Sequence, residues 1–256
     1  MVHTVTAQTL TQAVAEHLRT LIHQGEVGPG ERLFAERELA ERLGVTRASL
    51  REAIRALQQE GYVQVRRGAL GGTYVTELIE PLEKWRMRMR SQTGEFDDII
   101  DLRIALETQT ARLAAIRRDR ADLTRLRTSI KSLGRVSSGH SAFRRSDAQF
   151  HAWLARAAGN LRLETAVESA RGELFVPHDL LPYTDPIEGS RRDHQQIYEA
   201  VRDGNPGTAA SAMREHIERT RHQLRQIVFG SGNGSIQPTP WPRHAAGQHS
   251  KTLSEP

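Results

Sequence analysis

The stretch AERELAERLGVTRASLREAIRAL, residues 35–57, decides the fold of the first part of the chain. Its apolar residues, three or four positions apart, predict two amphipathic helices, one over residues 35–43 and another over 47–60. Gly44 stands where the end of a helix favours positive φ, and Thr46 offers the side-chain oxygen of an N-cap. Two short helices joined by so tight a turn are typical of a helix-turn-helix.

The flanking residues add a third helix and a small hairpin. Apolar residues recur at helical spacing over 10–22, ahead of a segment rich in glycine. Residues 62–65 and 73–75 alternate in polarity as strands do, and a pair of glycines lies between them. Three helices followed by a hairpin form the pattern of a winged helix-turn-helix, which we expect over residues 8–76.

The helix predicted over 47–60 carries arginines on the face opposite its apolar stripe. Arg47, Arg51 and Arg55 are spaced four residues apart and therefore share one side of the helix. Residues 46–67 contain five Arg against two Glu. Guanidinium groups suit guanine edges and phosphates, and a helix in this position enters the major groove. The pattern therefore predicts contact with double-stranded DNA.

The rest of the chain is predicted to be mainly helical. Residues 77–94 form a charged linker, and residues 230–256, rich in Gly, Ser, Pro, Gln and His, predict a disordered tail. Between them, in a domain over 95–229, short breaks separate helical segments near 95–117, 119–134, 141–158, 160–175, 186–203 and 206–229. Such short connections predict an antiparallel all-α bundle, so the fold class is mainly α.

Composition narrows the classes of function. The 256 residues include no Cys, which excludes disulfides, thiolate metal sites and cysteine nucleophiles. Because no apolar run approaches the ~20 residues of a membrane helix and no signal peptide is recognisable, we expect a cytoplasmic protein without a membrane partner. The net charge of +5 does not by itself indicate nucleic acid, because an Arg-rich composition is also expected from a GC-rich genome.

Four polar residues of the predicted bundle lie on the apolar faces of their helices. Asp147 and His151 are four residues apart, and His194 and His216 lie on the stripes of two later helices. A buried carboxylate needs a partner, and a divalent metal would explain three imidazoles around it. Taken singly, each His is better explained as a core or half-buried residue. The donor set suits zinc first, with nickel or manganese as alternatives.

The sequence GEVGPGERLFAERELAERLGVTR at 25–47, continued by LREAIRAL at 50–57, resembles the GntR family of bacterial transcription regulators, and within it the FadR subfamily. The resemblance implies that Arg37, Arg47 and Arg51 contact operator DNA and that the wing glycines approach the minor groove. Ala35 departs from the family, which often has Ser or Thr there, and so removes a capping oxygen. The residues expected to contact DNA are Arg37, Thr46, Arg47, Ser49, Arg51, Arg55, Arg67, Gly71 and Gly72.

Residues from about 95 to 229 resemble the FCD domain, the effector-binding half of FadR-type regulators. The resemblance is carried by LRIALE at 102–107, DAQFH at 147–151, AGN at 158–160, HQQI at 194–197 and MREHI at 213–217. It implies a metal held by Asp147, His151, His194 and His216, and a small organic acid as effector. Arg103 resembles an Arg that meets effector carboxylates, with Arg112 and Arg145 as alternatives.

These features together predict a transcription regulator controlled by a small carboxylate bound near the metal; a repressor is favoured, and the sequence leaves an activator open. We expect a homodimer, because a two-fold protein reads the two half-sites of a palindromic operator. In one alternative the divalent ion is itself the effector. A metalloenzyme is disfavoured, because no general acid or base accompanies the four ligands and the helix-turn-helix would be unexplained; we therefore expect no enzyme.

Overall fold

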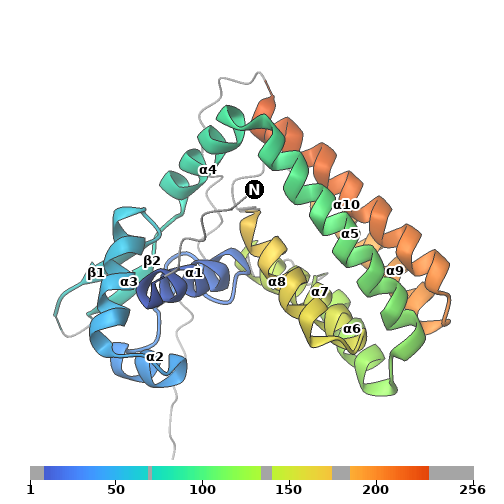
Figure 1. Cartoon of the computed structure of the whole chain (residues 1–256), viewed down its shortest axis with the longest axis horizontal. Coiled ribbons are helices and arrows are strands. Elements are labelled where there is room, and N and C mark those ends of the chain that lie inside the picture. The colour runs from blue at the N-terminus through green and yellow to red at the C-terminus, as the bar shows by residue number, and fades with distance from the viewer. Residues whose placement is uncertain (1–8, 69–70, 134–139, 175–184, 231–256) are drawn as a thin grey trace, which may run out of the picture.

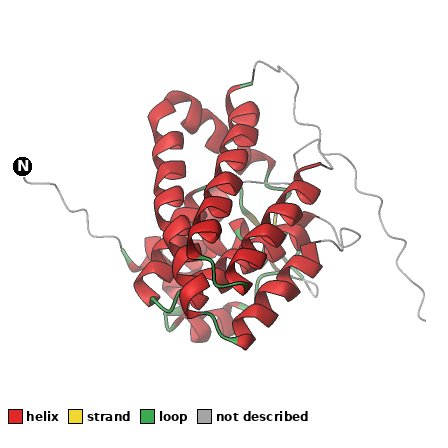
Figure 2. Cartoon of the chain, turned by 90° about the vertical axis from the view of Figure 1, so that its right-hand side faces the viewer, coloured by secondary structure: helices red, strands yellow, loops and turns green. Residues whose placement is uncertain are grey.

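The computed structural model describes residues 9–68, 71–133, 140–174 and 185–230. Within these residues the chain forms ten helices and one two-stranded sheet (Figure 1), which confirms the mainly α fold class. Figure 2 shows how small the share of strand is. No helix in the described part of the chain is long and apolar enough to cross a membrane. The tail predicted to be disordered lies, apart from Gly230, outside the described residues.

The first three helices pack around one apolar core. Leu18, Leu50 and Leu57 are completely buried there. Thr46 caps the third helix by accepting a hydrogen bond from the Ser49 amide at 3.1 Å, as its position predicts. The helices are α1 (Leu10–His23), α2 (Glu36–Leu43) and α3 (Arg47–Gln59).

Two features at the ends of α2 follow from the residues found there. Gly44 ends the helix with φ of 65°, a left-handed conformation that glycine adopts at little cost. At the other end, Ala35 stands at the N-cap and provides no side-chain hydrogen bond. The missing capping oxygen at the start of α2 is therefore confirmed.

The wing is larger than the predicted hairpin. β1 (Val63–Arg66) and β2 (Gly72–Val75) pair antiparallel, with Val63 opposite Val75. On the other side of β2, the amide of Leu33 donates to the carbonyl of Thr73 at 2.9 Å, and the amide of Val75 donates to the carbonyl of Glu31 at 3.0 Å. The segment before α2 thus anchors the wing to the helical core.

The region expected to be a linker contains a helix, α4 (Ile79–Ser91). Its Leu82, Trp85 and Met89 are buried at helical spacing; of the charged residues between them, Lys84 and Arg88 are exposed, whereas Arg86 is also buried. The many charges and Pro81 obscured this periodicity, although a proline in the first turn is compatible with a helix. α4 leads from the wing to the bundle (Figure 1).

Six helices form the bundle, close to the ranges that periodicity predicts. α5 and α10 lie side by side along their length, and α6, α7 and α8 lie between this pair and the first domain (Figure 1). Phe96, Phe150 and Ile197 are completely buried in its core. The helices are α5 (Thr93–Arg117), α6 (Arg120–Leu133), α7 (His140–Ala157), α8 (Leu161–Glu173), α9 (Asp185–Arg202) and α10 (Pro206–Phe229).

Candidate metal centre and DNA-binding surface

The four residues expected to bind a metal converge inside the bundle. Asp147 and His151 come from α7, His194 from α9 and His216 from α10, and one donor atom of each lies within 4.8 Å of the others. Donors about 2.0–2.2 Å from an ion on opposite sides are at most ~4.4 Å apart. Binding one ion would therefore draw the donors closer together than they lie in the metal-free chain.

His194 tests whether the cluster fits a metal. Both of its ring nitrogens are buried and have no hydrogen-bond partner among the described residues, although buried polar groups are normally paired. Nε2 lies 3.5 Å from Asp147 Oδ1, close to the ~3.4 Å between two ligands of one tetrahedral ion. Burial, together with the neighbouring His216, lowers the pKa of His194 well below its usual value. The ring is therefore neutral, as a metal ligand must be.

Two carboxylates that the sequence pattern does not predict lie behind the other two imidazoles. Glu107 of α5 is buried, and its Oε2 lies 2.5 Å from His151 Nδ1. Asp193 of α9 accepts a hydrogen bond from His216 Nδ1 at 3.1 Å. The one signal in the sequence was position, since Asp193 directly precedes a predicted ligand and Glu107 follows Arg103 by one helical turn.

Arg171 of α8 ties the acidic groups of the centre together. Its Nη2 donates to Asp147 Oδ2 at 2.7 Å and its Nη1 donates to Glu107 at 3.4 Å. Burial alone would raise the pKa of Asp147, but Arg171 and the three histidines outweigh it and lower the pKa below the usual value. Asp147 is therefore a carboxylate at neutral pH, although it lies inside the bundle.

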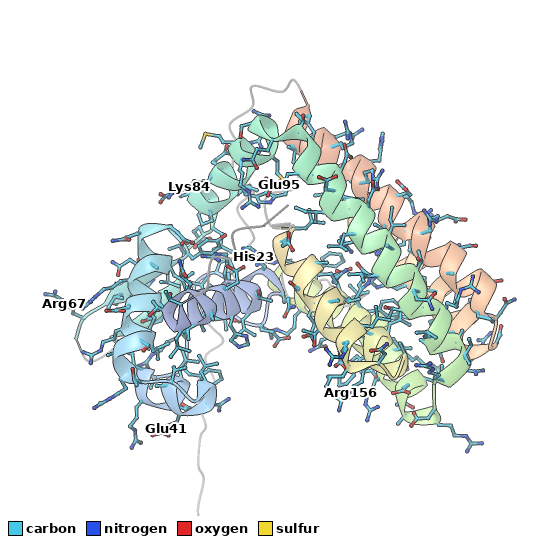
Figure 3. All side chains as sticks on the ribbon, in the orientation of Figure 1. His23, Glu41, Arg67, Lys84, Glu95 and Arg156 are labelled. Carbon is cyan, nitrogen blue, oxygen red and sulfur yellow. The ribbon has the colours of Figure 1, made fainter. Side chains whose placement is uncertain are left out.

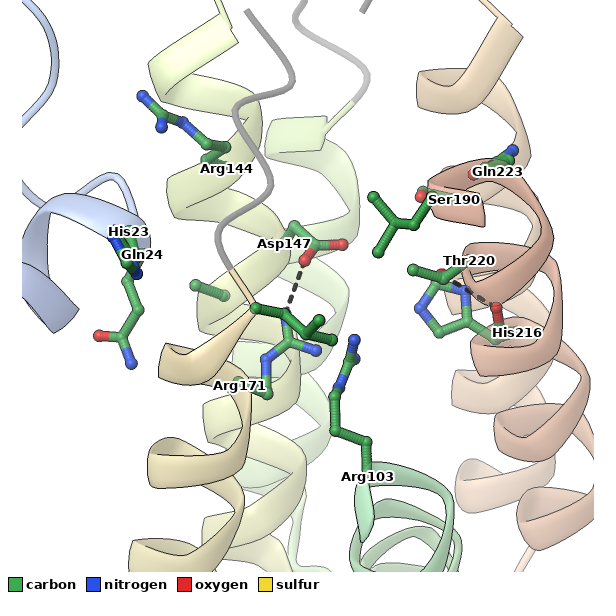
Figure 4. A pocket seen from close by; sticks show the side chains of 13 residues that line it. His23, Gln24, Arg103, Arg144, Asp147, Arg171, Ser190, His216, Thr220 and Gln223 are labelled. Atoms are coloured by element: carbon green, nitrogen blue, oxygen red, sulfur yellow. Dashed lines mark hydrogen bonds and ion pairs between the residues drawn. The ribbon is translucent and has the colours of Figure 1, made fainter. Parts of the chain in front are cut away.

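A cavity of about 70 Å³ lies beside the cluster (Figure 4). Arg103, Arg171 and Asp147 line it from the bundle, and His23 and Gln24 line it from the end of α1. Figure 4 shows the guanidinium groups of Arg103 and Arg171 near the Asp147 carboxylate. Two guanidinium groups thus lie beside the cluster, each paired with one of the centre's carboxylates.

Of the three arginines considered for the effector, only Arg103 lines this cavity. It is buried, and its Nε donates to Glu107 Oε1 at 2.7 Å. Arg112 is exposed on α5. Arg145 turns toward the first domain, where its Nε donates to the carbonyl of Gly25 at 2.9 Å. The geometry thus favours Arg103 as the candidate.

The arginines expected to contact DNA lie on the surface of α2, α3 and the wing. All are exposed: Arg37 on α2; Arg47, Arg51 and Arg55 on α3; and Arg67 just after β1. Figure 3 shows Arg67 projecting outward from the wing. This surface can meet phosphates and base edges.

The remaining four residues expected at the DNA have structural roles in the free chain. Thr46 and Ser49 form the cap of α3, which leaves Ser49 half-buried. Gly71 and Gly72 are half-buried in the wing. A Cβ at Gly72 would lie 2.4 Å from Arg32 Nε, so the wing has no room for a side chain there unless Arg32 moves.

Comparison with known proteins agrees with both halves of this structure. Residues 10–75 match the bacterial regulatory proteins of the gntR family, and residues 98–219 match the FCD domain. The HTH-type transcriptional regulator LutR of Bacillus subtilis is 30% identical over 221 residues, covering 80% of this chain and 96% of its own. The Uxu operon transcriptional regulator of Escherichia coli is 31% identical over 231 residues, covering 86% and 89%.

A solved structure shares the fold. E. coli McbR/YncC has a TM-score of 0.51 with 19% sequence identity, over 86% of this chain and 98% of its own. The two matched families cover the winged helix-turn-helix and most of the bundle. The chain therefore belongs to the GntR family of DNA-binding transcription regulators, in the FadR-like group whose members carry an FCD domain.

Proposed function

We propose that the protein is a homodimeric repressor whose affinity for a palindromic operator is controlled by a small carboxylate bound beside a metal ion. One observation carries this proposal: the cavity next to the Asp147 cluster is lined both by cations of the bundle and by the end of α1 in the DNA-binding domain. A ligand in this cavity would therefore touch the sensing and the DNA-binding parts at once. Acting on genomic DNA, the protein would work in the cytoplasm.

The metal would be held by Asp147, His151, His194 and His216. Zinc suits three imidazoles and one carboxylate, and nickel and manganese are the alternatives. When bound, the ion supplies positive charge and, above four-coordination, positions that an anionic ligand can occupy. The chain's own residues would bind the effector and connect its site to the DNA-binding domain.

Arg103 and Arg171 would receive the effector carboxylate. Guanidinium groups bind carboxylates through two parallel hydrogen bonds, and they remain charged when buried. The Nε of Arg103 is engaged by Glu107, so the Nη groups are the part of this guanidinium left to bind a ligand. A cavity of about 70 Å³ selects a small acid.

The route from this cavity to the DNA-binding domain is short. Arg171 precedes Gly172, whose carbonyl lies 2.8 Å from His23 Nδ1 of α1, and His23 Nε2 lies 3.0 Å from the Tyr62 hydroxyl. The Tyr62 amide in turn donates to the carbonyl of Leu57, in α3. A ligand that moves Arg171 would therefore shift a contact at Tyr62, three residues beyond the end of the recognition helix.

The direction of regulation rests on relatives. The HTH-type transcriptional repressor NanR of Citrobacter rodentium is 28% identical over 226 residues, covering 85% of this chain and 87% of its own. In this proposal the repressor leaves its operator when the effector binds. The test is fluorescence anisotropy with the palindrome upstream of the protein's own gene, with and without carboxylates selected by thermal shift. The proposal would be contradicted if none of the carboxylates that stabilise the protein changed its affinity for the operator.

A second function is favoured by the ion pair between Arg171 and Asp147. An ion that takes Asp147 as a ligand would weaken this pair and free Arg171 without any organic acid. The metal would then be the effector. Titration of metal-free protein on operator DNA distinguishes the two functions, because only a metal sensor changes its operator affinity with metal alone.

A further inference from the structure

The three candidate ligand histidines are held in two different ways. Glu107 lies at Nδ1 of His151, and Asp193 lies at Nδ1 of His216. His194 has no such carboxylate among the described residues; its ring stacks on Phe150, with centroids 4.0 Å apart and planes inclined by 10°. Each ring is thus fixed by a neighbour that is not itself a candidate ligand.

The two carboxylates determine which ring nitrogen is left for a metal. A neutral imidazole carries one N–H, and a carboxylate at Nδ1 holds the proton there. The lone pair is then on Nε2, on the opposite side of the ring. Such carboxylate–histidine–metal arrangements fix ring orientation and make the ligand more basic.

The surroundings of Glu107 show why this residue is buried. Its Oε1 accepts from Arg103 and its Oε2 lies near both His151 and Arg171. The guanidinium groups of Arg103 and Arg171 compensate the charge of this buried carboxylate, and its Oε2 is left against the His151 ring.

Asp193 is held just as firmly on the other side of the centre. Arg219, one turn after His216 on α10, donates to Asp193 Oδ2 at 2.9 Å and to Oδ1 at 2.5 Å. This two-point pair leaves Asp193 Oδ2 against the His216 ring. Together, Arg219 and Asp193 clamp His216 between α9 and α10.

We propose that Glu107 and Asp193 are positioning residues of the metal centre, each holding the N–H of one ligand imidazole so that the opposite nitrogen faces the ion. The inference rests on the proposed metal site. It assigns to α5, which supplies none of the four ligands, a direct part in metal affinity. The acidic residues in ion pairs on the surface of the bundle are expected to have no such part in metal affinity.

The test is zinc affinity measured by competition with a chromophoric chelator. Glu107→Gln and Asp193→Asn are each expected to raise the Kd about 10–100-fold. Asp97→Asn is the matched control: Asp97 pairs with Arg225 across α5 and α10 at 2.7 Å, away from the centre. This control is expected to bind zinc as the unchanged protein does.

A second readout separates positioning from simple loss of stability. With Co²⁺ at saturation, the visible spectra of Glu107→Gln and Asp193→Asn should differ from that of the unchanged protein, whereas the Asp97→Asn spectrum should match it. Asp193 is less completely buried than Glu107, with 8% of its surface exposed against 1%, so Asp193→Asn keeps the test decisive even if the Glu107 variant does not fold.

The outcomes distinguish this inference from the proposed function. An unchanged protein that binds neither Zn²⁺ nor Co²⁺ contradicts the metal site itself. An unchanged protein that binds metal, with both variants equal to it in Kd and in spectrum, overturns the positioning role and leaves the metal site standing. Weakened binding in the two variants, with a normal control, supports the inference.

Discussion

The carbonyl oxygen of Gly172 accepts a hydrogen bond from His23 Nδ1 at 2.8 Å, which ties the last turn of α8 to the end of α1. Burial lowers the pKa of His23 to about 3, so the ring is neutral and has a single N–H to donate. The Tyr62 hydroxyl then donates to His23 Nε2. The helices meet closely here, because a Cβ at Gly172 would lie 3.1 Å from Thr20 Oγ1.

His23→Ala should weaken the coupling between effector and operator. Allosteric coupling is typically worth about 5–150-fold in affinity, and we expect this ratio to fall toward one without the His23 ring. The measurement is operator affinity with and without the carboxylate for each variant, so that a general loss of binding cancels in the ratio. His17→Ala, an exposed His on the same helix, is the control. A His23→Ala ratio equal to that of the control would rule out this route.

Acid should destabilise the metal-free protein. His23 and His151 have pKa values lowered to about 3 and about 4, mainly by burial, whereas an unfolded His titrates near 6.5. Between these values the unfolded chain binds more protons than the folded chain, so the free energy of unfolding falls as pH decreases from about 6.5. Urea unfolding at pH 7.5, 6 and 5 checks the sign. A free energy of unfolding that stays constant or rises as the pH decreases from 7.5 to 5 would show that these histidines are not buried in the neutral form.

Arg47→Ala and Arg51→Ala should each weaken operator binding by about 1–3 kcal/mol if these arginines contact bases. Binding should also decrease steeply with salt, because phosphate contacts release counterions. Fluorescence anisotropy measures both effects. Arg156→Ala, an exposed Arg of α7 in the bundle (Figure 3), is the control for loss of one positive charge. If both α3 variants bind the operator as this control does, the assignment of α3 as the recognition helix is refuted.

The sequence predicted most of the helices because their patterns are local. Each buried stripe, such as Leu50 with Leu57 in α3, recurs at helical spacing within one segment. α4 was missed because its short stripe around Trp85 is interrupted by charged residues, and only packing against neighbouring elements shows which face is buried. Local periodicity thus predicts the other helices, whereas α4, in the expected linker, is recognised only from its tertiary contacts.

The four candidate ligands could be predicted for the same reason, since a polar residue on an apolar stripe is visible in the sequence. Glu107 and Asp193 could not be, because a single acidic residue on a helix normally faces water. Their partners come from other helices: His151 for Glu107 and His216 for Asp193. The effector candidate was left open between three arginines, because only the folded chain shows which one reaches the cavity.

Metal content tests the central claim most directly. Elemental analysis of the purified protein should find about one divalent ion per chain, and none in His194→Ala or His216→Ala, because three imidazoles and one carboxylate complete a single site. Chelation should lower the melting temperature, since ligands from three helices make metal binding part of the folding energy. A protein purified without metal that also shows no thermal shift with Zn²⁺, Ni²⁺ or Mn²⁺ would contradict the account.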